Sequence, residues 1–105
     1  MEQVDILSIA AHPDDIELTC AGTMIKMIEN GYSAGILDLT RGEMGTRGTP
    51  ELRTKEAEAA RAIIGARFRE TMNLGDSRLT ASVENRLQVA EKIRAARPKT
   101  VILPY

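Results

Sequence analysis

The strongest constraint on the fold is a regular alternation between short apolar segments and longer segments whose apolar residues recur at helical spacing. The short segments are rich in branched residues and end in turn-forming residues, which is typical of buried strands. The longer segments carry their apolar residues on one face, which is typical of helices packed on a sheet. Strands are expected over residues 4–10, 33–40, 68–74 and 100–103, and helices over residues 16–29, 49–65 and 82–96.

This alternation predicts the order β-α-β-α-β-α-β and therefore an α/β fold. Helices that connect successive strands imply right-handed crossovers and a mainly parallel sheet covered on both faces, which is a Rossmann-like sandwich of three layers. Ligands of such folds bind beyond the carboxyl ends of the strands. The loops 12–15, 41–50 and 75–79 all follow strands, so we expect the functional site among them.

Local signals support the expected helix ends. Thr49 is a good N-cap, and Pro50 fits the first helical position because its missing N–H is not needed there. Gly65 closes the same helix, and Asn30-Gly31 supplies a left-handed stop for the helix before it.

Length and charge limit the organisation and the partners. A chain of 105 residues fits one domain, or part of one, so residues 1–105 are taken as a single unit. Fourteen basic and fifteen acidic side chains give a net charge of -1, which argues against nucleic acid or an anionic membrane as a partner. A small neutral substrate fits this charge better.

The remaining composition favours an intracellular setting. Cys20 is the sole cysteine, which excludes an internal disulfide and fits a reducing compartment. No apolar run approaches membrane-spanning length, and the beginning of the chain lacks a basic segment followed by an apolar one. We therefore expect a cytoplasmic protein.

The turn after the first expected strand contains the only histidine of the chain. His12 and Asp15 are three residues apart, with Pro13 restricting the backbone between them, so an imidazole nitrogen and a carboxylate oxygen can converge on one point. Such a pair suits zinc or a similar divalent ion. Asp14 would then lie beside the ion as a spare carboxylate able to accept and return a proton.

A purely structural interpretation of this turn is also open. Asp14 or Asp15 would cap the following helix, and His12 would be an exposed turn residue, because His-Pro-Asp turns are common at such points.

The loop after the second expected strand has the sequence TRGEMGTRG. Its glycines permit close approach of a substrate, and Glu43 and Arg47 offer polar contacts to it. The spacing of Gly42, Gly45 and Gly48 does not match phosphate-binding fingerprints. A tight turn without a binding role is the alternative.

Two further polar residues, Arg53 and Asp76, each have a simple structural interpretation. Arg53 and Glu56 are three residues apart on an expected helix and would form a surface ion pair worth a few tenths of a kcal/mol, on the order of 0.3. Asp76, in the stretch LGDSRL, is a natural turn former.

Three motifs taken together resemble the LmbE-like, or PIG-L-type, zinc-dependent N-deacetylases. They are AHPDD at 11–15, LTRGEMGTRGTPELRTKEAEAA at 39–60 and LGD at 74–76, and the resemblance covers nearly the whole chain. The long second motif is most similar to the bacterial enzymes of bacillithiol biosynthesis, which deacetylate N-acetylglucosaminyl malate.

The resemblance implies roles for particular residues. His12 and Asp15 would bind zinc, or another divalent metal, and Asp14 would be the general base. Arg53 and Asp76 would hold hydroxyl groups of an amino-sugar substrate. The resemblance also implies a homo-oligomer.

The chain departs from the bacillithiol pattern at one motif and ends before another. Leu74-Gly75-Asp76-Ser77 stands where that branch usually has Leu-Pro-Asp-Gly. The family's third zinc ligand is a histidine in a His-Pro-Asp-His motif after the fourth strand, which we expect beyond Tyr105. Residues 1–105 are therefore expected to be the N-terminal part of one LmbE-like deacetylase domain.

The expected function is metal-dependent hydrolysis of the N-acetyl group of an N-acetylglucosamine-type substrate, giving acetate and a free amino sugar. The alternative is a non-catalytic α/β module that binds a carbohydrate or a protein partner, in which the turn at His12 has no chemical role.

Overall fold

A computed structural model describes residues 1–42 and 48–104. Four strands alternate with helices in the expected order, with one additional helix. The elements are β1 (Ile6–Ala10), α1 (Asp15–Thr19), α2 (Ala21–Glu29), β2 (Ala34–Asp38), α3 (Pro50–Ile64), β3 (Phe68–Thr71), α4 (Val83–Ala96) and β4 (Thr100–Ile102).

The four strands form one parallel sheet in the order β3-β2-β1-β4. The register places Ser8 of β1 opposite Ile36 of β2 on one side and Ile102 of β4 on the other. All five residues of β1 and all five of β2 are buried, which explains why these strands appear in the sequence as nearly continuous apolar runs. The predicted α/β class is confirmed.

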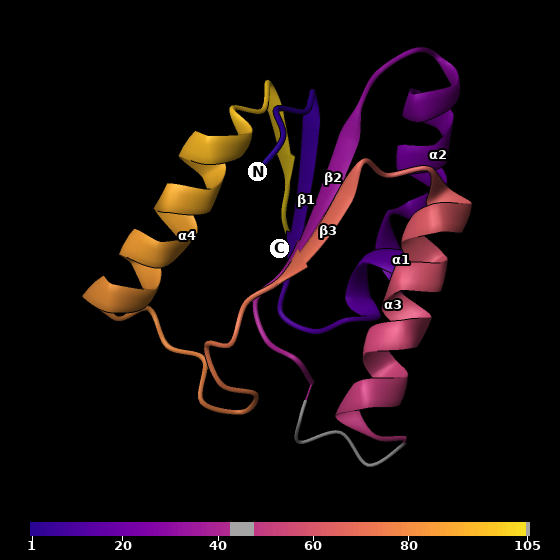
Figure 1. The fold of residues 1–105 in the computed structure, drawn as a ribbon. Coiled ribbons are helices and arrows are strands. Elements are labelled where there is room, and N and C mark those ends of the chain that lie inside the picture. Colours follow the sequence, from indigo (N-terminus) through magenta and orange to yellow (C-terminus); the bar gives the residue numbers. More distant parts are fainter. Residues whose placement is uncertain (43–47, 105) are drawn as a thin grey trace.

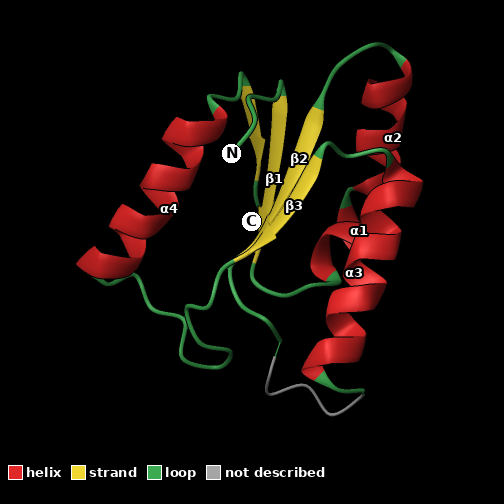
Figure 2. Ribbon diagram, viewed as in Figure 1, coloured by secondary structure: helices red, strands yellow, loops and turns green. Residues whose placement is uncertain are grey.

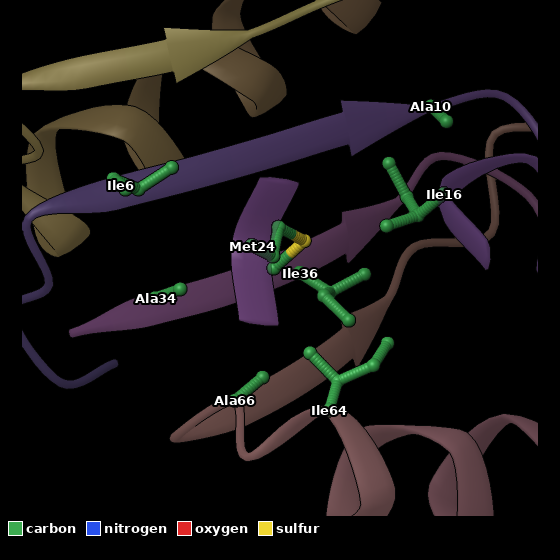
Figure 3. Close-up of a cluster of buried hydrophobic side chains, with 8 residues drawn as sticks. All are labelled: Ile6, Ala10, Ile16, Met24, Ala34, Ile36, Ile64 and Ala66. Atoms are coloured by element: carbon green, nitrogen blue, oxygen red, sulfur yellow. The ribbon is translucent and has the colours of Figure 1, made fainter. Parts of the chain in front are cut away.

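Helices cover both faces of the sheet, as expected from the crossovers (Figures 1 and 2). Helices α1, α2 and α3 lie on one face and α4 lies on the other. Because side chains alternate along a strand, each face has its own core. Figure 3 shows the larger core, which brings together Ile6, Ala10, Ile16, Met24, Ala34, Ile36, Ile64 and Ala66.

The α4 face has a second core. It consists of Val4, Leu7, Ile9, Leu37, Met72 and Ala96. Leu7 and Ile9 alternate with residues of the first core along β1, so this strand is anchored from both sides. The carboxyl end of β1, where the functional site is expected, therefore starts from a rigid support.

The single helix expected over residues 16–29 is wrong, because the chain breaks it into α1 and α2 at Cys20. The backbone of Cys20 has φ -136° and ψ 9°, outside the helical range. Ile16 and Met24 nevertheless pack into the same core on either side of the break. Apolar periodicity reports which face is buried, and a break that preserves the face leaves the periodicity unchanged.

The helix ends follow the predicted signals. The Thr49 side chain accepts a hydrogen bond from the backbone N–H of Leu52, and Pro50 occupies the first helical position. Gly65 ends α3 with φ 89°, a left-handed conformation that favours glycine. Across residues 1–42 and 48–104, no helix has the length and apolarity needed to cross a membrane.

Candidate active site

His12 lies in a tight turn directly after the central strand β1. The backbone N–H groups of Asp14 and Asp15 both donate to the carbonyl of His12, at 2.9 and 3.2 Å. The Asp15 side chain folds back, so that its Oδ2 accepts from the His12 N–H at 3.1 Å and lies 3.4 Å from His12 Nδ1. The turn thus brings one imidazole nitrogen and one carboxylate oxygen together, as the sequence predicted.

The other ring nitrogen of His12 is held by a residue from a distant loop. Nε2 lies 2.7 Å from Oδ1 of Asp76, which follows β3 and is buried. With Asp76 ionised, Nε2–H donates this bond, and the lone pair of a neutral imidazole is then on Nδ1, the nitrogen that faces Asp15. Asp76 therefore selects the tautomer of His12 as well as its orientation.

The charges around His12 also shift its protonation. Partial burial alone would lower the pKa of His12, but the hydrogen bond to Asp76 and the negative charges of Asp76 and Asp15 outweigh it. The pKa of His12 consequently lies above the ordinary value for histidine. A metal cation would have to compete with a proton for the ring nitrogen in this environment.

The geometry of His12 and Asp15 fits a divalent metal ion. Two ligand atoms that each lie about 2.1 Å from a tetrahedral ion are about 3.4 Å apart, and the separation of Nδ1 from Oδ2 is 3.4 Å. A histidine ligand usually donates its other N–H to a carboxylate, which is the arrangement of His12 with Asp76. Within the described residues, no group of three or more His, Cys, Asp or Glu is placed to hold a metal.

Asp14 lies beside this pair without serving as a cap. It occupies the N-cap position of α1, but its side chain accepts no capping hydrogen bond. More than half of the side chain is exposed, and its Oδ1 is 4.0 Å from Nη2 of Arg53. The interpretation of Asp14 as a helix cap is therefore wrong, and its carboxylate is free to meet a ligand at the sheet edge.

Arg53 turns toward the site and not toward Glu56. Its Nη1 donates to the carbonyl of Gly42 at 3.2 Å, and the guanidinium is mostly buried beside Asp14. Arg53 and Glu56, both in the described part of the chain, form no ion pair, so the expected surface pair is wrong. The contact exists because Gly42 has no Cβ, which would lie 2.8 Å from the Arg53 guanidinium carbon.

The remaining predicted binding residues, Glu43 and Arg47, lie in segment 43–47, outside the described residues. The loop before them is anchored to the site, because the backbone N–H and the hydroxyl of Thr40 both donate to the carbonyl of Ala11. The loops after β1, β2 and β3 therefore meet at one edge of the sheet, as the alternation of elements predicted.

Sequence reasoning missed a buried cluster of charges next to this edge. Arg69 of β3 forms an ion pair with Asp38 at the end of β2 and another with Glu17 of α1. One signal was available, because Asp38 interrupts an otherwise apolar strand and a charge there needs a partner. The partner itself is 31 residues further on and could not be identified from spacing.

A family model matches most of the chain. The model described as PIG-L: GlcNAc-PI de-N-acetylase matches residues 7–105. Diacetylchitobiose deacetylase from Thermococcus kodakarensis is 32% identical over 106 residues, which cover 94% of this chain and 40% of that protein.

Solved structures share the fold. The conserved protein TT1542 from Thermus thermophilus superposes with a TM-score of 0.93 at 47% identity, covering 98% of this chain and 47% of that one. GalB, the 4-carboxy-2-hydroxymuconate hydratase from Pseudomonas putida KT2440, gives a TM-score of 0.79 at 26% identity, covering 96% and 46%. The chain spans less than half the length of each of these three proteins.

Proposed function

Because this chain belongs to the PIG-L family, the GlcNAc-PI de-N-acetylases, we propose that its full-length protein hydrolyses the N-acetyl group of an N-acetylglucosamine-type substrate. The products are acetate and a free amino sugar. The observation that carries the proposal is the placement of the His12 ring between Asp15 and Asp76, with the Asp14 carboxylate exposed beside it.

His12 and Asp15 are the residues of this chain that would hold a metal ion, and PIG-L proteins generally depend on one. When bound, a zinc or similar ion supplies a Lewis acid for the acetyl carbonyl and makes a water molecule more acidic. Asp76 would contribute by holding the tautomer of His12 in which the Nδ1 lone pair is available to such an ion.

Asp14 is proposed as the general base and then the general acid. Its carboxylate accepts a proton from the water that attacks the acetyl carbon, and it returns that proton to the amide nitrogen as the C–N bond breaks. Its exposed position and its lack of a capping role leave the carboxylate available for both steps.

Arg53 is proposed to orient the sugar ring. Its guanidinium lies 4.0 Å from Asp14 and is fixed by the carbonyl of Gly42, so a hydroxyl bound there would place the acetamide near His12. For Asp76 the contact with His12 supports a main role in orienting that ring, because the side chain is buried and offers little surface to a sugar hydroxyl.

The substrate class extends to N-acetylglucosaminyl malate, which the motif around Arg53 favours. The turn that carries Asp76 differs from the Leu-Pro-Asp-Gly pattern of that branch in its backbone as well as its residues. Gly75 has φ 95°, which proline cannot adopt, and Ser77 has φ 63°, a conformation that glycine adopts more easily. Because this turn differs from that branch, the proposed substrates also include other N-acetylated glucosamine derivatives.

The test is acetate release by the full-length protein, loaded with zinc, from N-acetylglucosaminyl malate and from diacetylchitobiose. We expect acetate and free amine in equal amounts from at least one of them, and none from a His12→Ala variant. A wild-type protein that retains zinc but releases no acetate from any N-acetylglucosamine derivative would contradict the proposal. Hydration of a carbon–carbon double bond, the activity named for GalB, would then be the activity to assay.

A further inference from the structure

Arg69 is a buried cation that the proposed chemistry does not use. Its guanidinium donates to both carboxylate oxygens of Asp38, at 2.7 and 3.0 Å, and to both oxygens of Glu17, at 3.0 and 3.1 Å. A further bond of 3.3 Å reaches the carbonyl of Ala57. The Arg69 and Asp38 side chains are almost completely buried, so this is a buried ion-pair cluster and not a surface ion pair.

The partners of Arg69 lie on the segments that carry the site. Glu17 is two residues after Asp15 in α1, and Ala57 is one helical turn after Arg53 in α3. Asp38 ends β2, which continues into the loop that is bonded to the carbonyl of Ala11, next to His12. A single guanidinium therefore joins three segments that each lead to a site residue, without touching the site itself.

Helix α1 is held at its ends by the bonds between Asp15 and His12 and by the packing of Cys20 on the core, and Ile16 and Glu17 hold it between them. It contains five residues, of which Ile16 is the only buried one. So short a helix has little stability of its own, and its orientation depends on its contacts with the rest of the protein. Ile16 fixes one point of α1 in the core, and the two hydrogen bonds from Arg69 to Glu17 fix a second point, which limits rotation of the helix about the first.

We propose that Arg69 is a positioning residue for Asp15, acting through Glu17 to fix the orientation of α1 and so the separation of the Asp15 carboxylate from His12 Nδ1. This inference rests on the proposed function, because Asp15 matters in this way only if it binds a metal. Lysine cannot replace arginine here, since an ammonium group lacks the planar fork that bonds two carboxylates in pairs.

The experiment measures binding of Co²⁺ alone to the metal-free, full-length protein, by affinity and by the intensity of the d–d absorption bands. The variants are Glu17→Gln, which leaves the buried Arg69–Asp38 pair in place, and Arg69→Lys, which retains the charge. The control is Glu2→Gln, which breaks an exposed ion pair with Arg67 on the approach to the same strand β3. Circular dichroism confirms that each variant is folded before Co²⁺ is added, and urea midpoints are recorded for all of them.

Glu17→Gln and Arg69→Lys are each expected to weaken Co²⁺ binding about tenfold, the low end for groups that orient metal ligands. Both are also expected to change the d–d spectrum. Glu2→Gln is expected to change neither. Loss of stability alone would lower the urea midpoint without altering the spectrum of the folded protein, so the spectrum reports positioning. The two variants also separate geometry from charge, because Arg69→Lys alters only the geometry.

Two results would overturn the inference. If Arg69→Lys binds Co²⁺ with the wild-type affinity and spectrum, any effect of Glu17→Gln is due to its lost charge. If both variants behave like the wild type, the orientation of α1 does not depend on Arg69. A wild-type protein that binds no Co²⁺ would overturn the proposed function together with this inference, whereas normal wild-type binding confines the failure to the role of Arg69.

Discussion

His12 and Asp76 are 64 residues apart in the chain, yet Nε2 of the first lies 2.7 Å from Oδ1 of the second. This bond joins the loop after β1 to the loop after β3 across the intervening strand β2. It fixes the tautomer of the ring and so orients one of the two proposed metal ligands.

Asp76→Asn should lower the pKa of His12 in the metal-free protein. The variant removes the negative charge that helps to raise this pKa, while keeping a side chain of the same shape. NMR titration of the His12 ring measures the shift, and Glu58→Gln, on the outer surface of α3, serves as the control. An unchanged titration of His12 would show that Asp76 does not govern its protonation.

The same contact gives stability a pH dependence with a defined sign. The pKa of His12 is raised in the folded state, so the interaction of protonated His12 with its carboxylate neighbours stabilises the fold. This stabilisation is fully present below the unfolded pKa of about 6.5 and is lost as pH rises through the folded pKa. Asp76→Asn should therefore lower the urea midpoint more at pH 5.5 than at pH 8.5 in metal-free protein. A larger loss at the higher pH would contradict the sign.

His12→Ala and Asp15→Ala should each remove most of the bound metal from the full-length protein. Loss of one ligand from a small set leaves a site of much lower affinity. Elemental analysis after dialysis is expected to give about one divalent ion per wild-type chain and little in either variant. Full occupancy in both variants would refute the ligand assignment.

Asp14→Asn should retain the metal but reduce acetate release about 10²-fold or more, the usual scale for loss of a general base. The amide keeps the shape of the side chain and cannot accept the proton. Elemental analysis and acetate assays on the same preparation separate the two effects. Near-normal turnover by this variant would mean that another group moves the proton.

Gly42→Ala should displace Arg53 and impair turnover more than folding. A Cβ at this position would lie 2.8 Å from the guanidinium carbon, and the backbone φ of 66° is itself unfavourable for alanine, by about 1–2 kcal/mol. Gly42→Ala should lower kcat/KM for the sugar substrate more than the control variant Gly48→Ala does. Gly48 has a similar φ but lies near Leu52 and not near Arg53. Equal effects of the two variants would assign the loss to backbone strain.

Gly35→Ala should destabilise the sheet, because the Phe68 ring lies over this glycine. A Cβ would come within 2.3 Å of the ring, so Phe68 must move, and overpacking of this kind costs about 1–3 kcal/mol. Gly22→Ala, a helical position with open space around it, should instead add stability of up to about 1 kcal/mol. Urea denaturation of both variants tests the contrast.

The sheet and the location of the site could be predicted because they depend on local patterns. A strand buried on both faces is mostly apolar, as β1 and β2 are apart from Ser8 and Asp38, and the loops that follow parallel strands must meet at one edge. The turn at His12 was recognisable for the same reason, since His12 and Asp15 are close in sequence as well as in space.

Other features depend on contacts that spacing does not reveal. The partner of Asp76 was unpredictable because it is determined by the pairing of β2 with β3. Helical periodicity does not by itself give burial, since Ile63 of α3 and Leu87 of α4 are apolar but 81% and 61% exposed. A pattern identifies a candidate face, whereas burial requires a neighbouring element that covers it.

The two hydrogen bonds from Thr40 to the carbonyl of Ala11 span 29 residues and lie one residue before His12. Contacts between such distant residues carry a large entropy of loop closure, so they form only once the helices and strands between them have been placed. His12 and Asp15 approach each other within their own turn, but the bond from His12 to Asp76, 64 residues away, is expected to form late in folding. A metal ion that needs this geometry binds the native state selectively and stabilises it by mass action, and it is not a template around which the chain must first collapse.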